Sequence, residues 1–229
     1  MTASDVLVVD RVDKVFGPHT VLDAVSLSVP GGGAVVLRGP NGAGKSTLLS
    51  CIAGTLVPDR GTVTIDGHPM KDEPLAARAA MRYLPQEVEV PAGITGRELI
   101  TLSADIFGAD AAQVERAASL TGLGDALDRF ASTYSVGMRR RLAFGSLMLG
   151  APALFVLDEP FAGVDADGRA RLLHALTAAK ERGAGIVLAA HDRDAEDVAR
   201  LAPTRFDLGE ALHDDARDDG RDPPQESPT

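Results

Sequence analysis

Residues 39–47, which read Gly-Pro-Asn-Gly-Ala-Gly-Lys-Ser-Thr, constrain the fold of this chain more than any other stretch. They match the pattern Gly-x4-Gly-Lys-[Ser/Thr], in which the backbone N–H groups of a Gly-rich loop wrap a phosphate chain. The apolar residues 34–37 before the loop are typical of a buried parallel strand. Residues 45–53 after it favour a helix whose N-terminus faces the phosphates. Motif and context agree, so we expect a nucleotide site in an α/β fold.

Individual residues of this loop suit particular parts of a nucleotide. Glycine has no Cβ, so it can take a positive φ and let the backbone approach an anion closely. Lys45 brings a positive charge to the β and γ phosphates, and the Ser46 hydroxyl is a natural hard ligand for Mg²⁺. The residues expected to contact the nucleotide here are Gly39, Pro40, Asn41, Gly42, Ala43, Gly44, Lys45, Ser46 and Thr47.

Composition narrows the class of protein further. A length of 229 residues suffices for one large α/β domain, or for one domain that carries a subdomain. With 45% hydrophobic but only 4% aromatic residues and no Trp, the core must be built from Val, Leu, Ala and Ile, which suits helices packed on a parallel sheet. The formal charge is −10, and an acidic body without a basic face argues against nucleic acid as a partner.

Several features indicate a soluble protein of a reducing compartment. Cys51 is the only cysteine, so no intramolecular disulfide can form, and we expect it to be a small core residue. The N-terminus lacks the basic and apolar regions of a signal peptide. The longest uncharged stretch, 142–157, is interrupted at 150–152 and is short for a membrane span.

Hydrophobic periodicity predicts the order of the remaining elements. Residues 5–15 and 20–29 alternate apolar and polar side chains and predict two strands of an antiparallel sheet. Four further strands are predicted: 60–67 with its closing turn, one that ends through 83–85, 154–157, and 185–190. The predicted helices are 75–81, 96–107, 111–121, 125–130, 135–149, 167–182 and 193–201. We expect a P-loop NTPase core with a mixed sheet, an antiparallel β subdomain and an inserted helical subdomain at about 87–150 that lacks β patterning. This domain spans 1–213, and the acidic residues 214–229 are predicted to be a disordered tail.

Two carboxylates and a histidine follow predicted strands. Asp158 and Glu159 end the apolar run 154–157, which is where an α/β sheet places its ligand chemistry. Asp158 can hold Mg²⁺ through water, and Glu159 can orient or deprotonate the attacking water. His191 ends the strand 185–190 and could contact the γ-phosphate. Together with the phosphate loop, these residues outline a nucleotide hydrolase.

The order of these pieces resembles the ATPase subunit of an ATP-binding cassette (ABC) transporter over about residues 4–209. Residues 39–47 look like Walker A, 154–160 like Walker B with its catalytic glutamate, and 162–165 like the D-loop. The resemblance implies a catalytic set of Glu159, His191, Lys45 and Gln86, and a metal set of Ser46, Gln86 and Asp158. Gln86 matches the glutamine that senses the membrane partner, and His191 matches the switch histidine. The resemblance also implies that Asp165 of the D-loop binds nucleotide. It implies the same for Phe16, which falls where the family stacks an aromatic ring on adenine.

Residues 134–138 occupy the place of the family signature Leu-Ser-Gly-Gly-Gln. A capped helix N-terminus there would offer N–H groups and a positive dipole end to a phosphate, which in the family belongs to ATP held by the opposite subunit. Ser135 and Gly137 match the signature and are expected to contact that nucleotide. Val136 and Met138 replace a Gly and the Gln, and Met cannot donate a hydrogen bond, so we expect a working but altered second half-site.

The resemblance implies an ATPase that binds ATP and Mg²⁺, dimerises around ATP and powers a separate, membrane-embedded permease. The dimer would be a homodimer, or a heterodimer with a second ABC ATPase. It would be cytoplasmic and peripheral on the inner face of the cell membrane. Residues 134–139, of the form Tyr-Ser-x-Gly-Met-Arg, resemble drug- or polyketide-type exporters and favour export. Residues 34–42 are also similar to the haem-export ATPase of cytochrome c maturation, from which Gln86 departs.

Other classes of protein stay open as alternatives. A non-hydrolysing regulatory module would hold nucleotide without turnover, but the intact Lys45, Asp158, Glu159 and His191 argue against it. Soluble ABC proteins of ribosome or DNA metabolism resemble paired cassettes or carry coiled-coil arms, and neither arrangement fits this length. A small kinase or GTPase would leave the helix at Ser135 without a purpose, and the chain has no Asn-Lys-x-Asp guanine motif.

Overall fold

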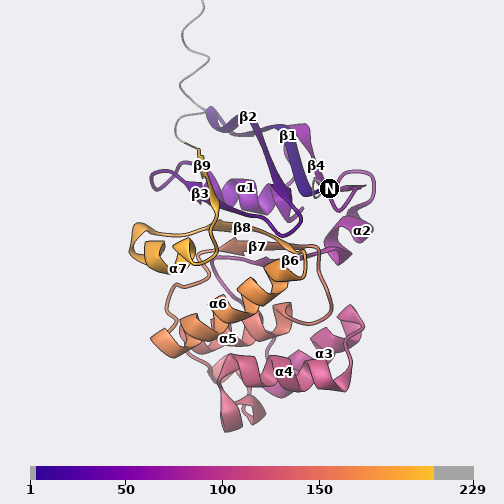
Figure 1. Cartoon of the computed structure of the whole chain (residues 1–229), viewed down its shortest axis with the longest axis vertical. Coiled ribbons are helices and arrows are strands. Elements are labelled where there is room, and N and C mark those ends of the chain that lie inside the picture. Colours follow the sequence, from indigo (N-terminus) through magenta and orange to yellow (C-terminus); the bar gives the residue numbers. More distant parts are fainter. Residues whose placement is uncertain (1–3, 209–229) are drawn as a thin grey trace, which may run out of the picture.

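Two sheets and the helices around them make up residues 4–208, the part of the chain that the computed structural model describes (Figure 1). The strands are β1 (Asp5–Phe16), β2 (His19–Pro30), β3 (Ala34–Arg38), β4 (Arg60–Ile65), β5 (His68–Pro69), β6 (Met81–Leu84), β7 (Leu154–Asp158), β8 (Gly185–Ala189) and β9 (Thr204–Asp207). The α-helices are α1 (Lys45–Ile52), α2 (Pro74–Ala79), α3 (Gly96–Phe107), α4 (Ala111–Thr121), α5 (Val136–Leu147), α6 (Ala166–Glu181) and α7 (Ala195–Ala199). Short 3₁₀ helices are η1 (Gly124–Asp128), η2 (Ala131–Thr133) and η3 (Asp192–Asp194).

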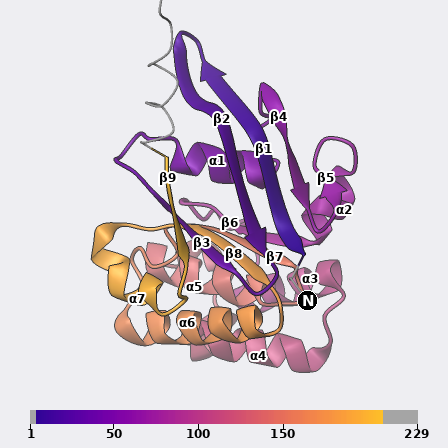
Figure 2. The same ribbon diagram turned by 45° about the horizontal axis from the view of Figure 1, so that its top comes forward.

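The first sheet is antiparallel, with the strand order β2-β1-β4-β5. Its hairpin β1–β2 turns at Gly17, whose φ of 58° suits a residue without a side chain. Val9 and Val12 are both buried although they are three residues apart, because an irregularity in the strand register, with Arg11 at a φ of 44°, interrupts the alternation between them. Figure 2 shows this sheet standing over α1.

The second sheet is parallel, with the strand order β6-β7-β8-β3-β9, and both of its faces are covered. Alternate residues of β3 show this: Val35 and Leu37 pack with α1 and the antiparallel sheet, whereas Ala34 and Val36 pack with α5 and α6. In Figures 1 and 2, α1 lies between the two sheets, and α5 and α6 lie beyond the parallel sheet. Parallel strands end at one edge, so the segments that follow β3, β6, β7 and β8 meet there.

The helical part of the chain has a core of its own. Ile100 of α3, Ala117 of α4 and Leu142 of α5 are buried in one apolar cluster, which we call the helical cluster and which also includes Ala104, Ala118, Leu123, Leu127, Ala131, Tyr134 and Leu149. Reciprocal capping boxes begin α3, at Thr95 and Glu98, and α4, at Asp110 and Gln113. These helices form the layer farthest from the antiparallel sheet (Figure 1).

The predicted fold is confirmed: a P-loop core with a parallel and an antiparallel sheet and a set of helices. Several local predictions were wrong. The predicted helix 125–130 is the 3₁₀ helix η1, after which Phe130 forms an isolated β-bridge with Thr95, so this part is not free of β pairing. The predicted helix 193–201 is shorter, because the residues of η3 form a 3₁₀ turn before α7. Met81, predicted to end a helix, begins β6, and β9 was not predicted.

The predicted tail 214–229 and the end of the predicted domain at 213 lie outside the described residues. Within residues 4–208, no helix combines the length and the apolar character that crossing a membrane requires.

Candidate nucleotide-binding and catalytic site

The phosphate loop connects β3 to α1 at the shared edge of the parallel sheet. Gly39, Gly42 and Gly44 have φ values of 141°, 86° and 91°, which residues with side chains rarely adopt. At Gly44 a Cβ would lie 2.9 Å from the backbone oxygen of Val21, so the fold also excludes a side chain there. No side chain caps the start of α1. The first N–H groups of the helix are therefore left for an anion in the loop.

Lys45 folds back over this loop. Its Nζ donates hydrogen bonds to the backbone oxygens of Gly39 at 2.7 Å and Pro40 at 2.8 Å. The ammonium group is thereby held above the cradle of N–H groups, with a hydrogen left to donate. Loop, helix N-terminus and Lys45 together make a site for a polyphosphate.

Asp158 is a buried carboxylate at the end of β7, with 2% of its surface exposed. Its Oδ1 has no hydrogen-bond partner among the described residues. Burial raises the pKa of Asp158, and hydrogen bonding with the neighbouring Ser46 side chain opposes this shift. An unpartnered buried carboxylate oxygen beside a hydroxyl suits a hard cation, because Mg²⁺ prefers oxygen ligands. The residues present therefore fit a magnesium site.

Glu159 brings together residues that follow three strands. Its Oε1 lies 2.8 Å from Nε2 of His191, which follows β8, and 3.4 Å from Nε2 of Gln86, which follows β6. An ionised carboxylate only accepts, so the amide nitrogen of Gln86 donates to it, and the ring nitrogen of His191 lies within ion-pair distance. The backbone N–H of Glu159 donates to Ala189, and its φ of 48° is unusual for a residue with a side chain. Glu159, His191 and Gln86 thus meet at one oxygen.

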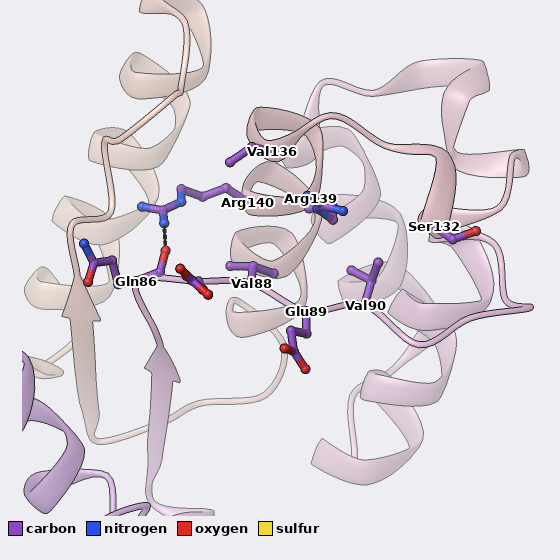
Figure 3. Close-up of a pocket in the computed structure, with 9 residues that line it drawn as sticks. Gln86, Val88, Glu89, Val90, Ser132, Val136, Arg139 and Arg140 are labelled. Atoms are coloured by element: carbon purple, nitrogen blue, oxygen red, sulfur yellow. Dashed lines mark hydrogen bonds between the residues drawn. The ribbon is translucent and has the colours of Figure 1, made fainter.

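Arg140 joins the site from α5 and was missed by the sequence analysis. Its guanidinium donates one hydrogen bond to the backbone oxygen of Glu159. It donates another to the backbone oxygen of Gln86, which is the dashed line in Figure 3. Only 3% of its surface is exposed. The three consecutive arginines at 139–141 were the available signal, but a sequence does not show which of them turns inward.

The signature residues lie at the start of α5. The Ser135 hydroxyl caps this helix by accepting a hydrogen bond from the backbone N–H of Met138 at 3.2 Å. Gly137 packs against the predicted D-loop, since a Cβ on it would lie 2.4 Å from the backbone oxygen of Gly163. Asp165, at the other end of that loop, caps α6 by accepting from Gly168 at 2.8 Å.

The two departures from the signature differ in their surroundings. Met138 was expected beside the phosphate of the opposite subunit, but its side chain packs against the helical cluster. Positions 135 and 138 are neighbours on α5, because residues three apart lie on one side of a helix, so it is the packing against the helical cluster that distinguishes Met138 from Ser135. Val136 is 63% exposed, so this substitution changes the accessible surface at the helix start more than that of the partly buried Met138 does.

Phe16 lies at the end of β1 and is 48% exposed. The ammonium of Lys14 is 5.4 Å from the centre of its ring. The hairpin adjoins the phosphate loop, because Val21 of β2 borders Gly44. This position leaves the ring free for a stacking partner.

The fold and this arrangement define a P-loop nucleotide-binding protein, and comparisons with known proteins specify the family. Residues 22–162 match the family model described as ABC transporter. The daunorubicin/doxorubicin resistance ATP-binding protein DrrA of Streptomyces peucetius is 37% identical over 188 residues, which are 80% of this chain and 57% of DrrA. The zinc import ATP-binding protein ZnuC of Pseudomonas putida is 35% identical over 191 residues, which are 82% of this chain and 70% of ZnuC.

A solved structure described as the ATP-binding subunit of an ABC transporter superposes with a TM-score of 0.76 at 32% identity, covering 82% of this chain and 80% of that one. The chain therefore belongs to the ABC transporter family, within its ATP-binding subunits. It spans little more than half the length of DrrA.

Proposed function

We propose that this chain binds and hydrolyses ATP as a dimer and thereby powers a separate permease in the membrane. The observation that carries hydrolysis is the meeting of Glu159, His191 and Gln86 at one carboxylate oxygen, beside a phosphate loop. A carboxylate that accepts from the Gln86 amide and lies against the His191 ring is restrained in orientation, which is what a base that positions water needs. This convergence favours hydrolysis over the alternative of a module that only holds nucleotide.

Magnesium is proposed to bind between the phosphate loop and β7. Ser46 would ligate the ion directly, Asp158 through water, and Gln86 from the side of β6. The unpartnered Oδ1 of Asp158 supports this assignment. When bound, the ion would neutralise charge on the phosphates. Lys45 and the N–H groups of α1 hold the phosphate chain, and Glu159 takes the proton of the attacking water.

Dimerisation is proposed because one chain does not complete its own site. Lys45 begins α1 on one face of the parallel sheet, whereas Ser135 begins α5, which packs on the other face. The exposed helix start at Ser135 would therefore meet a nucleotide held by a second subunit, either an identical chain or a second ABC ATPase. Asp165 and Phe16 complete the proposed nucleotide contacts.

The permease is proposed to dock in a groove of about 600 Å³ beside Gln86 (Figure 3). Val88, Val90 and Val136 give this groove an apolar lining, and acidic side chains stand at its border. Gln86 lines the groove, and its side-chain nitrogen lies 3.4 Å from Oε1 of Glu159, so an occupant would be sensed at the proposed catalytic carboxylate. Such an assembly would lie on the cytoplasmic face of the membrane. Export is the proposed direction, in line with the resistance protein DrrA, although the import protein ZnuC is nearly as similar.

The test is Glu159→Gln, which keeps the shape of the side chain and removes its basicity. Steady-state ATP hydrolysis should fall by about 100-fold or more, the scale of losing a positioned base. ATP affinity, measured by calorimetry, should be retained, and ATP should trap a dimer that size-exclusion chromatography detects.

Glu115→Gln is the matched control, since Glu115 is an exposed acid of α4. It should hydrolyse ATP like the wild type. A Glu159→Gln protein that still hydrolyses ATP normally would refute the catalytic role. A variant that stays monomeric with bound ATP at high protein concentration would refute the dimer. A wild type that binds ATP but never hydrolyses it would make the chain a regulatory module.

A further inference from the structure

Arg140 is a buried guanidinium without a direct ionic partner. It lies on α5 with 3% of its surface exposed, and the described residues place no carboxylate within salt-bridge distance of it. Its two terminal nitrogens donate to the backbone oxygens of Glu159 and Gln86, while its Nε has no partner among the described residues. Figure 3 shows the guanidinium reaching the Gln86 backbone from α5.

Such a group is costly to bury, so its surroundings must compensate. Removing an arginine charge from water costs several kcal/mol unless hydrogen bonds and nearby charges offset the loss. Burial lowers the pKa of Arg140, and the charges of Glu159 and Asp158 act in the opposite direction. The compensation therefore comes from the proposed catalytic centre itself.

The two carbonyls that Arg140 holds belong to residues whose side chains also meet. Nε2 of Gln86 lies 3.4 Å from Oε1 of Glu159, although the two residues follow different strands. The guanidinium is planar, and the spacing of its donors is fixed. Binding both backbones therefore fixes their separation, and with it the gap between the two side chains. Glu159 needs such a restraint, because its φ of 48° is strained for a glutamate.

We propose that Arg140 is a positioning residue that holds the carboxylate of Glu159 at a set distance from Gln86. This inference rests on the proposed function, since it gives Glu159 the role of base and Gln86 that of metal ligand. Arg140 touches neither the nucleotide loop nor the reacting atoms. It acts through the backbone of both residues and ties their spacing to α5, the helix that begins at Ser135.

The test is Arg140→Met, which keeps an apolar stem and removes both donors. The kcat for ATP should fall by about 100-fold, the scale of a displacement of about 1 Å in a catalytic group. The affinity for ATP should stay at the wild-type value, because the phosphate loop is untouched. Arg140→Lys keeps the charge but has a single donor nitrogen, so its kcat should lie between those of the wild type and Arg140→Met.

Arg82→Met is the matched control. Arg82 is also buried, with 5% exposed, and it donates only to backbone oxygens outside the site, those of Ala79, Met81 and Leu149. Its replacement should lower the melting temperature about as much as Arg140→Met does. Below both transitions, however, its kcat should equal that of the wild type. Equal losses of kcat in the two variants would mean that Arg140 is merely structural.

Amide hydrogen exchange supplies a readout that needs no hydrolysis. In Arg140→Met the amides of residues 87–89 and 161–162 should exchange faster together, and in Arg82→Met they should not. Unchanged exchange at both segments would overturn the proposal. If Arg140→Met fails to fold, Arg140→Lys decides by the same kinetic and exchange measurements, and wild-type kcat there would refute the role. A wild type without ATPase activity would refute the proposed function, while the exchange result would still decide whether Arg140 holds both segments.

Discussion

Replacing Gly137 by alanine tests the close approach of α5 to the predicted D-loop. The added Cβ would lie 2.4 Å from the backbone oxygen of Gly163. Even weak C–H···O contacts keep carbon and oxygen about 3.3–3.6 Å apart, so one backbone must move by about 1 Å. Overpacking of this kind typically costs about 1–3 kcal/mol.

Helix propensity acts in the opposite direction. Alanine is favoured over glycine inside a helix by up to about 1 kcal/mol, and by less near a helix end. The clash is with backbone rather than with a flexible side chain, so we expect the steric term to dominate. The net loss should be about 1 kcal/mol, which lowers the melting temperature of a chain of this size by about 2–4 °C.

Thermal unfolding followed by circular dichroism measures this change, and urea unfolding gives the free energy directly. Val136→Ala is the control, because Val136 is exposed in the same helical turn and its replacement should change stability by no more than about 0.5 kcal/mol. A Gly137→Ala protein that is as stable as the wild type would refute the reasoning. It would show that the loop yields without cost.

Two further predictions concern Met138 and Asp158. Met138→Gln should not raise ATP turnover, because the Met138 side chain packs against the helical cluster. Urea unfolding should instead show a free energy of unfolding that is lower by about 1 kcal/mol, roughly half the value of burying a whole methionine side chain. Asp158→Asn should stabilise the nucleotide-free protein by about 1 kcal/mol at neutral pH, since it removes a buried charge. The pKa of Asp158 is raised in the folded state, so the wild type should lose stability as pH rises from the ordinary aspartate pKa through this raised value. Melting temperatures measured across this pH range should show that Asp158→Asn lacks this loss. Mg²⁺ should also no longer increase the stabilisation of that variant by ATP.

Helices with strong signals in their own sequence were predicted with the correct first and last residues. The predicted helices 96–107 and 111–121 match α3 and α4, because an apolar stripe and the capping pairs Thr95/Glu98 and Asp110/Gln113 are written in the sequence. β9 has no such signal. It has four residues, none of them buried, and it is a strand only because β3 binds it. A strand of this kind forms because a distant segment pairs with it, so the hydrophobic pattern of its own residues does not predict it.

The candidate site divides in the same way. The phosphate loop could be predicted from its spacing, and the meeting of Gln86, Glu159 and His191 follows from parallel strands that end at one edge. The inward turn of Arg140 and the packing of Met138 depend on how α5 is rotated against the core. The hydrophobic pattern of α5 does not fix that rotation, because arginines occupy both its buried and its accessible sides.

The backbone at Glu159 has a consequence for the evolution of stability at this position. Its φ of 48° lies in the left-handed region, where a side chain with a Cβ costs about 1–2 kcal/mol. Glycine would adopt this conformation without strain, so a substitution that abolishes the proposed catalysis should leave the fold as stable or stabler. Selection for stability alone would remove the glutamate. Under the proposed role of Glu159, activity and stability are traded against each other at position 159, so stabilising substitutions should be sought at other positions.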